Sequence, residues 1–236
     1  MAHLCAIHKH IFQDVYDWAG KLRTVNISKE NSLFCLCEYM PSWMDDIHGR
    51  LKRDDYLRGL DKPAFVDKIT RFHGDVDGLH PFREGNGRAT RVFIDQLARQ
   101  AGYVLDQEKI EQNKQSWNRA AALALYGQED MKKAFFNDAI RPGRAVAFAL
   151  QPQTEALKAY PELAEAFKVM RQAEQYFSTK LPAASQKAAL VQVRTHIQNQ
   201  LEAGKTGDFQ EVWKKPEKPK PSRTLKPEKT EPDIER

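Results

Sequence analysis

The chain has few cysteines and lacks any long apolar run. Its 236 residues include three cysteines, Cys5, Cys35 and Cys37, with no metal-site spacing beyond one Cys-x-Cys. This odd number favours reduced thiols over a disulfide framework or a zinc site. No apolar run approaches the length of a membrane span, and the start lacks the basic-then-apolar pattern of a secretory signal. We therefore expect a cytoplasmic protein without a membrane span.

The formal net charge of +5 is concentrated at the C-terminal end. Residues 214–236 contain eight Lys or Arg and five Asp or Glu, so they carry +3 of that charge. The high sequence pI, near 9.0, is therefore poor evidence for specific nucleic-acid binding. The same stretch has five prolines and only two aliphatic residues, too few to bury a core. We expect a disordered Pro- and Lys-rich tail over 206–236.

Twelve consecutive residues between two apolar segments combine a base, an acid, two glycines and several arginines. At Gly85, Asn86 and Gly87 the backbone can adopt conformations that turn successive N–H groups toward an anion. A helix is expected directly after them, and its partially positive N-terminus would lie at the same point. The pattern predicts a site for a polyphosphate. The run reads His80-Pro81-Phe82-Arg83-Glu84-Gly85-Asn86-Gly87-Arg88-Ala89-Thr90-Arg91.

Four side chains of this run suit phosphate chemistry. Arg88 and Arg91 are three residues apart, so on a helix they can share one face and meet two oxygens of one anion. Glu84 beside phosphates implies a Mg²⁺ ion between them. His80 titrates near neutrality and is the candidate to take a proton from an attacking hydroxyl. Taken singly, these residues could be a helix-end histidine, a solvated basic face and a turn, but the joint pattern favours function.

The run resembles the signature of Fic-domain proteins, His-x-Phe-x-(Asp/Glu)-Gly-Asn-Gly-Arg-x-x-Arg, at every position. The likeness extends upstream through residues 7–23 and downstream to about Ile140, and it is strongest to bacterial Fic toxins and AMP-transferase effectors. The resemblance implies a protein adenylyltransferase, which cleaves ATP between its α- and β-phosphates. Such an enzyme attaches AMP to a Tyr, Thr or Ser hydroxyl of another protein, with ATP as co-substrate and Mg²⁺ as cofactor.

The resemblance also implies a role for each matching residue. His80 corresponds to the general base and Glu84 to the Mg²⁺ ligand. Two interpretations of Asp77 stay open: it could orient the imidazole of His80, or it could be a solvated acid at the end of the preceding helix. The residues implied to bind ATP or its phosphates are Arg83, Gly85, Asn86, Gly87, Arg88 and Arg91.

A short hairpin is expected between the first two helices, in the place of the flap with which Fic relatives bind their target. Residues 24–27 alternate polar and apolar side chains, residues 29–32 favour a turn, and residues 33–36 favour a strand. Its edge could pair with a peptide main chain. The alternative is an ordinary hairpin packed on the bundle. The residues predicted to bind the target are Thr24, Val25, Asn26, Ile27, Leu33 and Phe34.

Helical periodicity dominates the remaining sequence and predicts an all-α, Fic-like bundle with one small hairpin. We expect a Fic domain over 1–140, a small C-terminal helical module over 141–205 that forms a helical hairpin, and the tail. The first helix is expected to extend through Val15 and Trp18, with Gly20 capping it. The other helices are expected at about 41–59, 65–79, 88–100, 106–125, 128–140, 154–178 and 183–203.

Two departures from the Fic pattern concern completeness and control. Fic cores begin with a helix upstream of the Ile7-His8 region, so we expect that this helix is missing, because the chain is a fragment or its start is misassigned. The inhibitory pattern (Ser/Thr)-x-x-x-Glu-(Gly/Asn), whose glutamate would meet Arg91, finds no match. The nearest stretch, 224–228, is followed by a lysine, and the prolines at 221 and 227 oppose a helix there. An inhibitory helix would then come from a separate small antitoxin, from the absent N-terminal part, or not at all, and we expect the antitoxin.

Alternative functions stay open at this point. The chain could be a conjugation- or secretion-associated effector that is translocated into another cell, or an inactive nucleotide-binding module. The transferred group could be UMP or phosphocholine, because the motif recognises phosphates and not the base. Some Fic toxins modify topoisomerase subunits, so such a subunit is one possible target.

Overall fold

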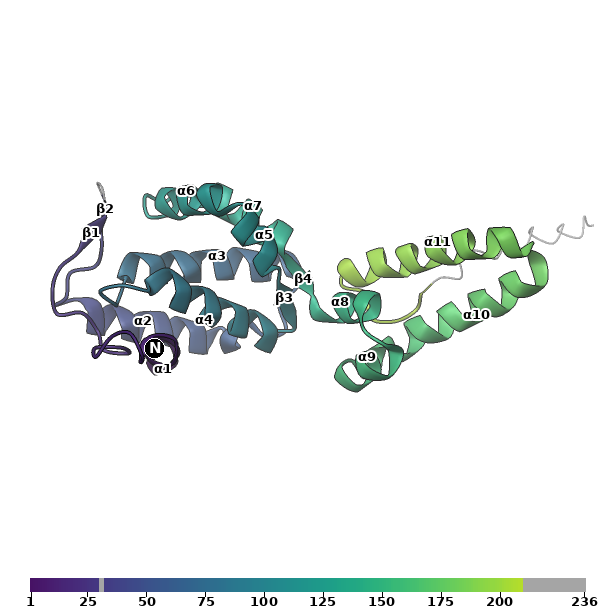
Figure 1. The fold of residues 1–236 in the computed structure, drawn as a ribbon, viewed down its shortest axis with the longest axis horizontal. Helices are drawn as coiled ribbons and strands as arrows, with labels where there is room; N and C mark the ends of the chain where they lie inside the picture. Colours follow the sequence, from purple (N-terminus) through teal and green to yellow (C-terminus); the bar gives the residue numbers. More distant parts are fainter. Residues whose placement is uncertain (30–31, 210–236) are drawn as a thin grey trace, which may run out of the picture.

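The computed structural model describes residues 1–29 and 32–209, and it is mostly helical, as expected (Figure 1). Two groups of elements lie end to end, and each has its own apolar core (Figure 1). The first group contains α1 (Ala2–Phe12), α2 (Met40–Arg53), α3 (Lys62–Leu79), α4 (Asn86–Gln100), α5 (Gln107–Gln112), α6 (Lys114–Ala124) and α7 (Asp130–Ala139). The second contains α8 (Gly143–Leu150), α9 (Gln153–Ala159), α10 (Ala164–Lys180) and α11 (Ala183–Glu202).

Helices α3 and α4 form the centre of the first group. Helix α3 begins where the Asp61 side chain accepts a hydrogen bond from the Ala64 N–H, with Pro63 in the first turn. Its predicted apolar stripe, from Phe65 to Leu79, is buried. Helices α2 and α7 pack against α3, and α1 packs against α4. Burial of one apolar face of each helix therefore fixes the junction at which α3 ends and α4 begins.

The first helix is shorter than its apolar spacing predicts. Helix α1 ends at Phe12, and turns occupy most of residues 13–20. Val15, expected on the buried stripe, is 68% exposed. Gly20 has a φ of +77°, and a Cβ there would lie 2.7 Å from the Lys9 Cβ, so this loop folds back on α1.

Two small antiparallel sheets complete the first group. Strands β1 (Ser28–Lys29) and β2 (Ser32–Leu33) form the expected hairpin, with Ser28 opposite Leu33. Strands β3 (Tyr103–Leu105) and β4 (Ile140–Pro142) form a sheet that the sequence did not predict. Three-residue strands are too short to show an alternating pattern, and these two lie far apart in the chain. The helix expected over 106–125 is two helices, α5 and α6, which meet at Asn113.

The second group contains a helical hairpin of α10 and α11, as predicted, and a short helix, α8, that was not predicted. The helix expected over 154–178 is divided into α9 and α10. An ion pair between Arg141 and Glu202 links β4 with the end of α11. Phe209, expected in the disordered tail, is instead buried in the second core. The rest of the predicted tail, 210–236, lies outside the described residues, so that prediction stands untested there. The division into domains likewise stays a prediction.

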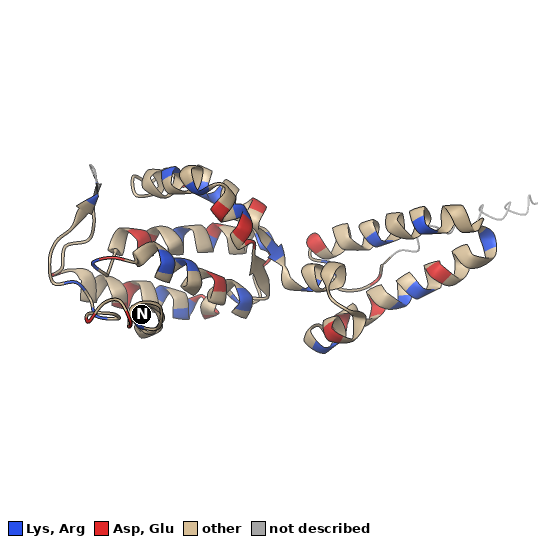
Figure 2. Cartoon of the chain, viewed as in Figure 1, with Lys and Arg blue, Asp and Glu red and all other residues tan. Residues whose placement is uncertain are grey.

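Charges of both signs are interspersed along the helices of both groups (Figure 2).

Of the helices in residues 1–29 and 32–209, none has the length and apolar character that crossing a bilayer requires.

Candidate active site

His80 lies at the C-terminal end of α3 in a left-handed conformation. Its φ of 45° and ψ of 61° terminate the helix, a geometry that costs a residue with a Cβ roughly 1–2 kcal/mol. The His80 N–H donates to the Val76 carbonyl at 3.1 Å, and its own carbonyl accepts from Arg23 Nε at 2.8 Å. The turn directs the chain from α3 into the loop that precedes α4.

The imidazole of His80 is held on two sides. The ring of Phe34 stacks on it, with 3.8 Å between centroids and 15° between planes. His80 Nδ1 lies 3.3 Å from the main-chain carbonyl of Asp77, which can only accept a hydrogen bond. A proton on Nδ1 leaves Nε2 with a free lone pair. Burial lowers the pKa of His80, although the carbonyl and charge of Asp77 act to raise it. The neutral, basic form is therefore favoured at pH 7.

The loop between α3 and α4 is fixed from within. Phe82 is fully buried. The Asn86 side chain accepts from the Phe82 N–H at 2.9 Å and donates to the Phe82 carbonyl at 2.7 Å. These two hydrogen bonds hold the Asn86 amide against the main chain of the loop. His8, which the sequence did not single out, stacks on Phe82 and lies 2.9 Å from the Glu84 carbonyl through Nε2.

Glycines shape the start of α4. Gly85 has a φ of +80°, and a Cβ there would lie 2.4 Å from the Phe12 ring, so no other residue fits. A Cβ on Gly87 would meet nothing within 4 Å, and Gly87 lines a cavity of about 660 Å³. The N-terminus of α4 thus opens onto a space in which an anion can approach the backbone.

The cavity brings together most of the residues that the sequence predicted. His80, Arg83, Glu84, Gly85, Asn86, Gly87 and Arg91 line it. Lys29 and Phe34 line it from the hairpin, and His73 and Asp77 line it from α3. The wall formed by α6 consists of Trp117, Asn118, Arg119, Ala121 and Ala122. The volume of the whole cavity is of the size that small-molecule ligands occupy in proteins.

The two motif arginines differ from the expectation that both meet the anion. Arg91 lines the cavity, and its Nη1 lies 2.9 Å from Glu111 Oε2. This partner of Arg91 is on α5 and was not foreseen, but both side chains are partly exposed, so the pair contributes at most about 1 kcal/mol. Arg88 instead lies over the ring of Phe12, 4.4 Å from its centroid, and is not among the described residues that line the cavity.

Glu84 is suited to a hydrated cation beside phosphates. Its side chain is 64% exposed, and its Oε1 accepts a hydrogen bond from the Gly85 N–H at 2.9 Å. Within the described ranges, no group of three or more His, Cys, Asp or Glu could hold a metal ion by itself. Magnesium in proteins is commonly held by one or two carboxylates together with substrate phosphates. One exposed carboxylate next to the start of α4 fits that kind of site.

The hairpin begins later than predicted. Thr24, Val25, Asn26 and Ile27 precede β1 and are not in its ladder, although the Phe34 N–H reaches the Ile27 carbonyl at 3.4 Å. The local alternation predicted the strand too early, because two of the residues 24–27 bond outside the ladder: the Val25 carbonyl accepts from Arg23 and the Asn26 side chain accepts from the Cys37 N–H. Leu33 is 69% exposed, whereas Phe34 is buried against His80. The predicted turn residues 30–31 lie outside the described residues.

Arg23 was also missed. Its buried guanidinium donates to the carbonyls of Val25, Cys35 and His80, so it ties both sides of the hairpin base to the end of α3. Nothing in its local sequence pattern separates it from a surface arginine.

Of the two open interpretations of Asp77, the structure favours the first, because Asp77 contacts the imidazole of His80. The Asp77 carboxylate points inward, with Oδ2 at 2.6 Å from Lys132 Nζ and 3.0 Å from His73 Nδ1. It is therefore not a solvated acid, and it contacts His80 through its carbonyl rather than through its carboxylate. Lys132 comes from α7 and was not singled out. Its place within an apolar helix face is the sequence pattern that could have indicated a buried lysine.

This fold and site define a class of all-α protein. In it, a cavity lies at the start of one helix, a histidine ends the preceding helix, and a hairpin covers that histidine. Residues 1–98 match the Fic/DOC family. The chain is 36% identical over 144 residues to a probable protein adenylyltransferase Fic of Salmonella typhimurium, covering 61% of this chain and 71% of that protein. The chain belongs to the Fic/DOC family, as the motif predicted.

A second curated relative is more similar but much longer. Protein adenylyltransferase VbhT of Bartonella schoenbuchensis is 45% identical over 132 residues, which is 56% of this chain and 27% of VbhT. The chain thus corresponds to about a quarter of that relative's length.

Solved Fic structures share the fold. The effector protein BepC of Bartonella tribocorum, with bound AMPPNP, aligns with a TM-score of 0.54 and 26% identity over 60% of this chain and 74% of its own. The Fic domain of a Bartonella quintana effector, with bound ADP, gives a TM-score of 0.55 and 26% identity over 60% of this chain and 72% of its own.

Proposed function

We propose that the chain is a protein adenylyltransferase that moves AMP from ATP to a Tyr, Thr or Ser hydroxyl of a target protein. One observation carries the proposal: the cavity at the start of α4 also contains His80, whose Nδ1 faces a carbonyl and whose Nε2 is free to accept a proton. The adenylyltransferase names of the relatives, and the AMPPNP in the BepC structure, support ATP as the donor.

The reaction follows from these positions. The target oxygen attacks the α-phosphorus of ATP as its proton passes to His80 Nε2. The bond between the α-phosphorus and the bridging oxygen to the β-phosphate breaks, and pyrophosphate leaves. The N–H groups at the start of α4 face the negative charge that develops on the α-phosphoryl, while Arg91 and Arg83 face the departing phosphates. Mg²⁺, when bound at Glu84, would neutralise part of this charge.

Arg88 has a different place in this scheme. Its contact with the Phe12 ring lies outside the cavity, so we assign Arg88 to the positioning of Phe12 and Glu84 before nucleotide binding. A role as a phosphate ligand would require its side chain to turn away from that ring.

The partners are proposed on chemical grounds. The target is a protein with an accessible hydroxyl, bound along the exposed edge of the hairpin near Leu33. The separate antitoxin that the sequence predicts, the topoisomerase subunit as target, and the cytoplasmic location remain predictions. BepC is a VirB-translocated effector protein. This similarity supports the alternative that the present chain is translocated and acts in another cell.

The test is mass spectrometry of a bacterial lysate incubated with the purified chain, Mg²⁺ and, in parallel, ATP, UTP or CDP-choline. The proposal predicts an AMP adduct on a hydroxyl residue in the ATP sample only, and no adduct with the His80→Ala variant. An adduct of UMP or phosphocholine without AMP would replace ATP as the donor. Absence of any adduct, with ATP still bound, would favour a nucleotide-binding module over an enzyme.

A further inference from the structure

Lys132 is a fully buried lysine that the reaction described above does not use. It lies on α7, is 0% exposed, and its Nζ is 2.6 Å from Asp77 Oδ2 on α3. The ring of Trp117 lies 5.6 Å from the same Nζ. Burying an ammonium group away from water is costly unless a counter-charge accompanies it. The Asp77 carboxylate supplies that charge, so the two groups are held to each other.

Asp77 makes contacts in two directions from one residue. Its carboxylate faces Lys132 and His73, while its main-chain carbonyl faces Nδ1 of His80 at 3.3 Å. The carbonyl belongs to the last turn of α3, where main-chain acceptors lack helical partners and depend on other groups for their position. A restraint on the Asp77 side chain therefore restrains the carbonyl that determines which nitrogen of His80 carries the proton.

We propose that Lys132 is a positioning residue for His80. Its ion pair holds the Asp77 carboxylate away from the base and thereby fixes the Asp77 carbonyl that faces Nδ1. The same pair neutralises the negative charge of Asp77, one helical turn before the base. This inference rests on the proposed function, in which His80 accepts the proton of the target. Under this inference, α7 helps to determine the protonation of His80, although α7 lies beyond the residues that match the family.

The pair acts on His80 among several other charges. Loss of the Lys132 charge would leave Asp77 unneutralised and would raise the pKa of His80, whereas loss of the Asp77 charge would lower it. These two opposite effects distinguish an electrostatic pair from general damage to the fold. The titratable and charged groups around the imidazole are Arg23 and Lys29 from the hairpin segment, His73 and Asp77 from α3, Arg83 and Glu84 from the loop, Arg91 from α4 and Arg119 from α6. Lys132 from α7 acts on the imidazole through its ion pair with Asp77.

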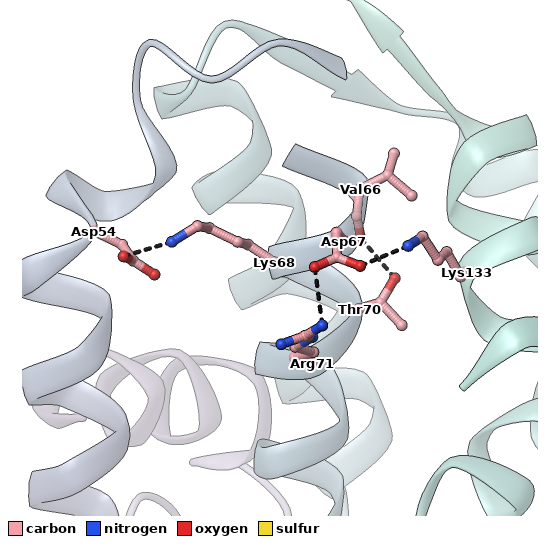
Figure 3. A network of polar contacts seen from close by, with 7 residues as sticks. All are labelled: Asp54, Val66, Asp67, Lys68, Thr70, Arg71 and Lys133. Carbon is pink, nitrogen blue, oxygen red and sulfur yellow. Dashed lines mark hydrogen bonds and ion pairs between the residues drawn. The ribbon is translucent and has the colours of Figure 1, made fainter. Parts of the chain in front are cut away.

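The adjacent lysine offers a matched control. Lys133 is also on α7 and also pairs with an aspartate of α3, because its Nζ lies 2.5 Å from Asp67 Oδ1 (Figure 3). Asp67 is 3.3 Å from Arg71 as well, so this pair belongs to a partly exposed network in the first half of α3 (Figure 3). His80 lies at the other end of that helix. Lys133→Met therefore removes an ion pair between α7 and α3 but leaves the pair of Lys132 with Asp77 in place.

The experiment measures kcat/KM for AMP transfer as a function of pH, with Lys132→Met, Lys133→Met and the original chain compared at saturating ATP. We expect Lys132→Met to move the acidic limb of the profile to higher pH by about half a unit to one unit and to lower kcat about tenfold. Lys133→Met should leave both unchanged. The ¹⁵N resonances of the His80 ring, assigned with His80→Ala, should show loss of the Nδ1-protonated tautomer in Lys132→Met alone.

A second variant decides the matter if Lys132→Met does not fold. Asp77→Asn keeps an acceptor for Lys132 but removes the negative charge, so we expect its acidic limb at lower pH than in the original chain. If the folded variants have acidic limbs of kcat/KM at the same pH as the original chain, the proposed role of Lys132 is wrong, even if kcat falls. If His80→Ala still transfers AMP, the proposed base itself is wrong, which is a separate and distinguishable failure.

Discussion

The imidazole of His80 stacks on the phenyl ring of Phe34, with 3.8 Å between the ring centroids and 15° between their planes. The hairpin that was expected to bind the target therefore also covers the proposed base. This contact excludes water from one face of the imidazole and contributes to the burial that lowers the pKa of His80. The position of the hairpin and the basicity of the histidine are thus linked through one aromatic pair.

Replacement of Phe34 by alanine should change the pH dependence of transfer. With less burial, the pKa of His80 rises toward its ordinary value near 6.5, so the acidic limb of kcat/KM moves to higher pH. The lost aromatic contact also frees the ring, and we expect a several-fold decrease of kcat at pH 7.5. Phe34→Leu, which keeps most of the apolar cover, should give a smaller shift. A limb at lower pH in Phe34→Ala would contradict this account of the pair.

Gly85 should not tolerate a side chain, because the ring of Phe12 lies against it. Gly85→Ala places a Cβ against Phe12 at a φ of +80°, and we expect the free energy of unfolding in urea to fall by about 2–4 kcal/mol. Gly127→Ala is the matched control, because Gly127 has nearly the same φ, +79°, with no atom within 4 Å of the added Cβ. It should cost only about 1 kcal/mol. Equal losses for both would remove the steric role of Phe12.

Replacement of Arg91 should weaken nucleotide binding more than replacement of Arg88. Arg91 lines the cavity, and loss of its charged hydrogen bonds to phosphate should raise the Kd of a non-hydrolysable ATP analogue by roughly 10- to 100-fold. Arg88→Ala removes a side chain that stacks on Phe12 outside the cavity, so its effect should stay within about fivefold. Calorimetric titration of both variants measures this difference. A larger effect at Arg88 would mean that its side chain turns into the cavity when nucleotide binds.

The sequence was sufficient to predict the motif because its information is local. One loop and two helix ends bring His80, Gly85, Gly87 and Arg91 to the same cavity, and the spacing of the run predicts that arrangement. The apolar stripe of α3 was predictable for a similar reason, since helical burial repeats within a few residues.

Residues that act across the fold could not be predicted in this way. Lys132 meets Asp77 only after α7 packs on α3, and Arg23 meets the His80 carbonyl only after the chain returns from α3. The contact of Arg88 with Phe12 likewise depends on how α1 packs against α4, and helical spacing alone does not reveal it. Such contacts depend on tertiary packing, which leaves no periodic trace in one sequence.

The central claim is that His80 takes the proton of the target hydroxyl while the rest of the cavity binds ATP. The most direct measurement compares the original chain with His80→Ala for transfer of radioactivity to protein from ATP labelled with ³²P at the α-phosphate, together with the affinity of each for an ATP analogue. The account predicts that His80→Ala loses transfer by at least about a hundredfold and binds the analogue with nearly unchanged affinity. Labelled protein at the original rate in the His80→Ala sample would contradict it.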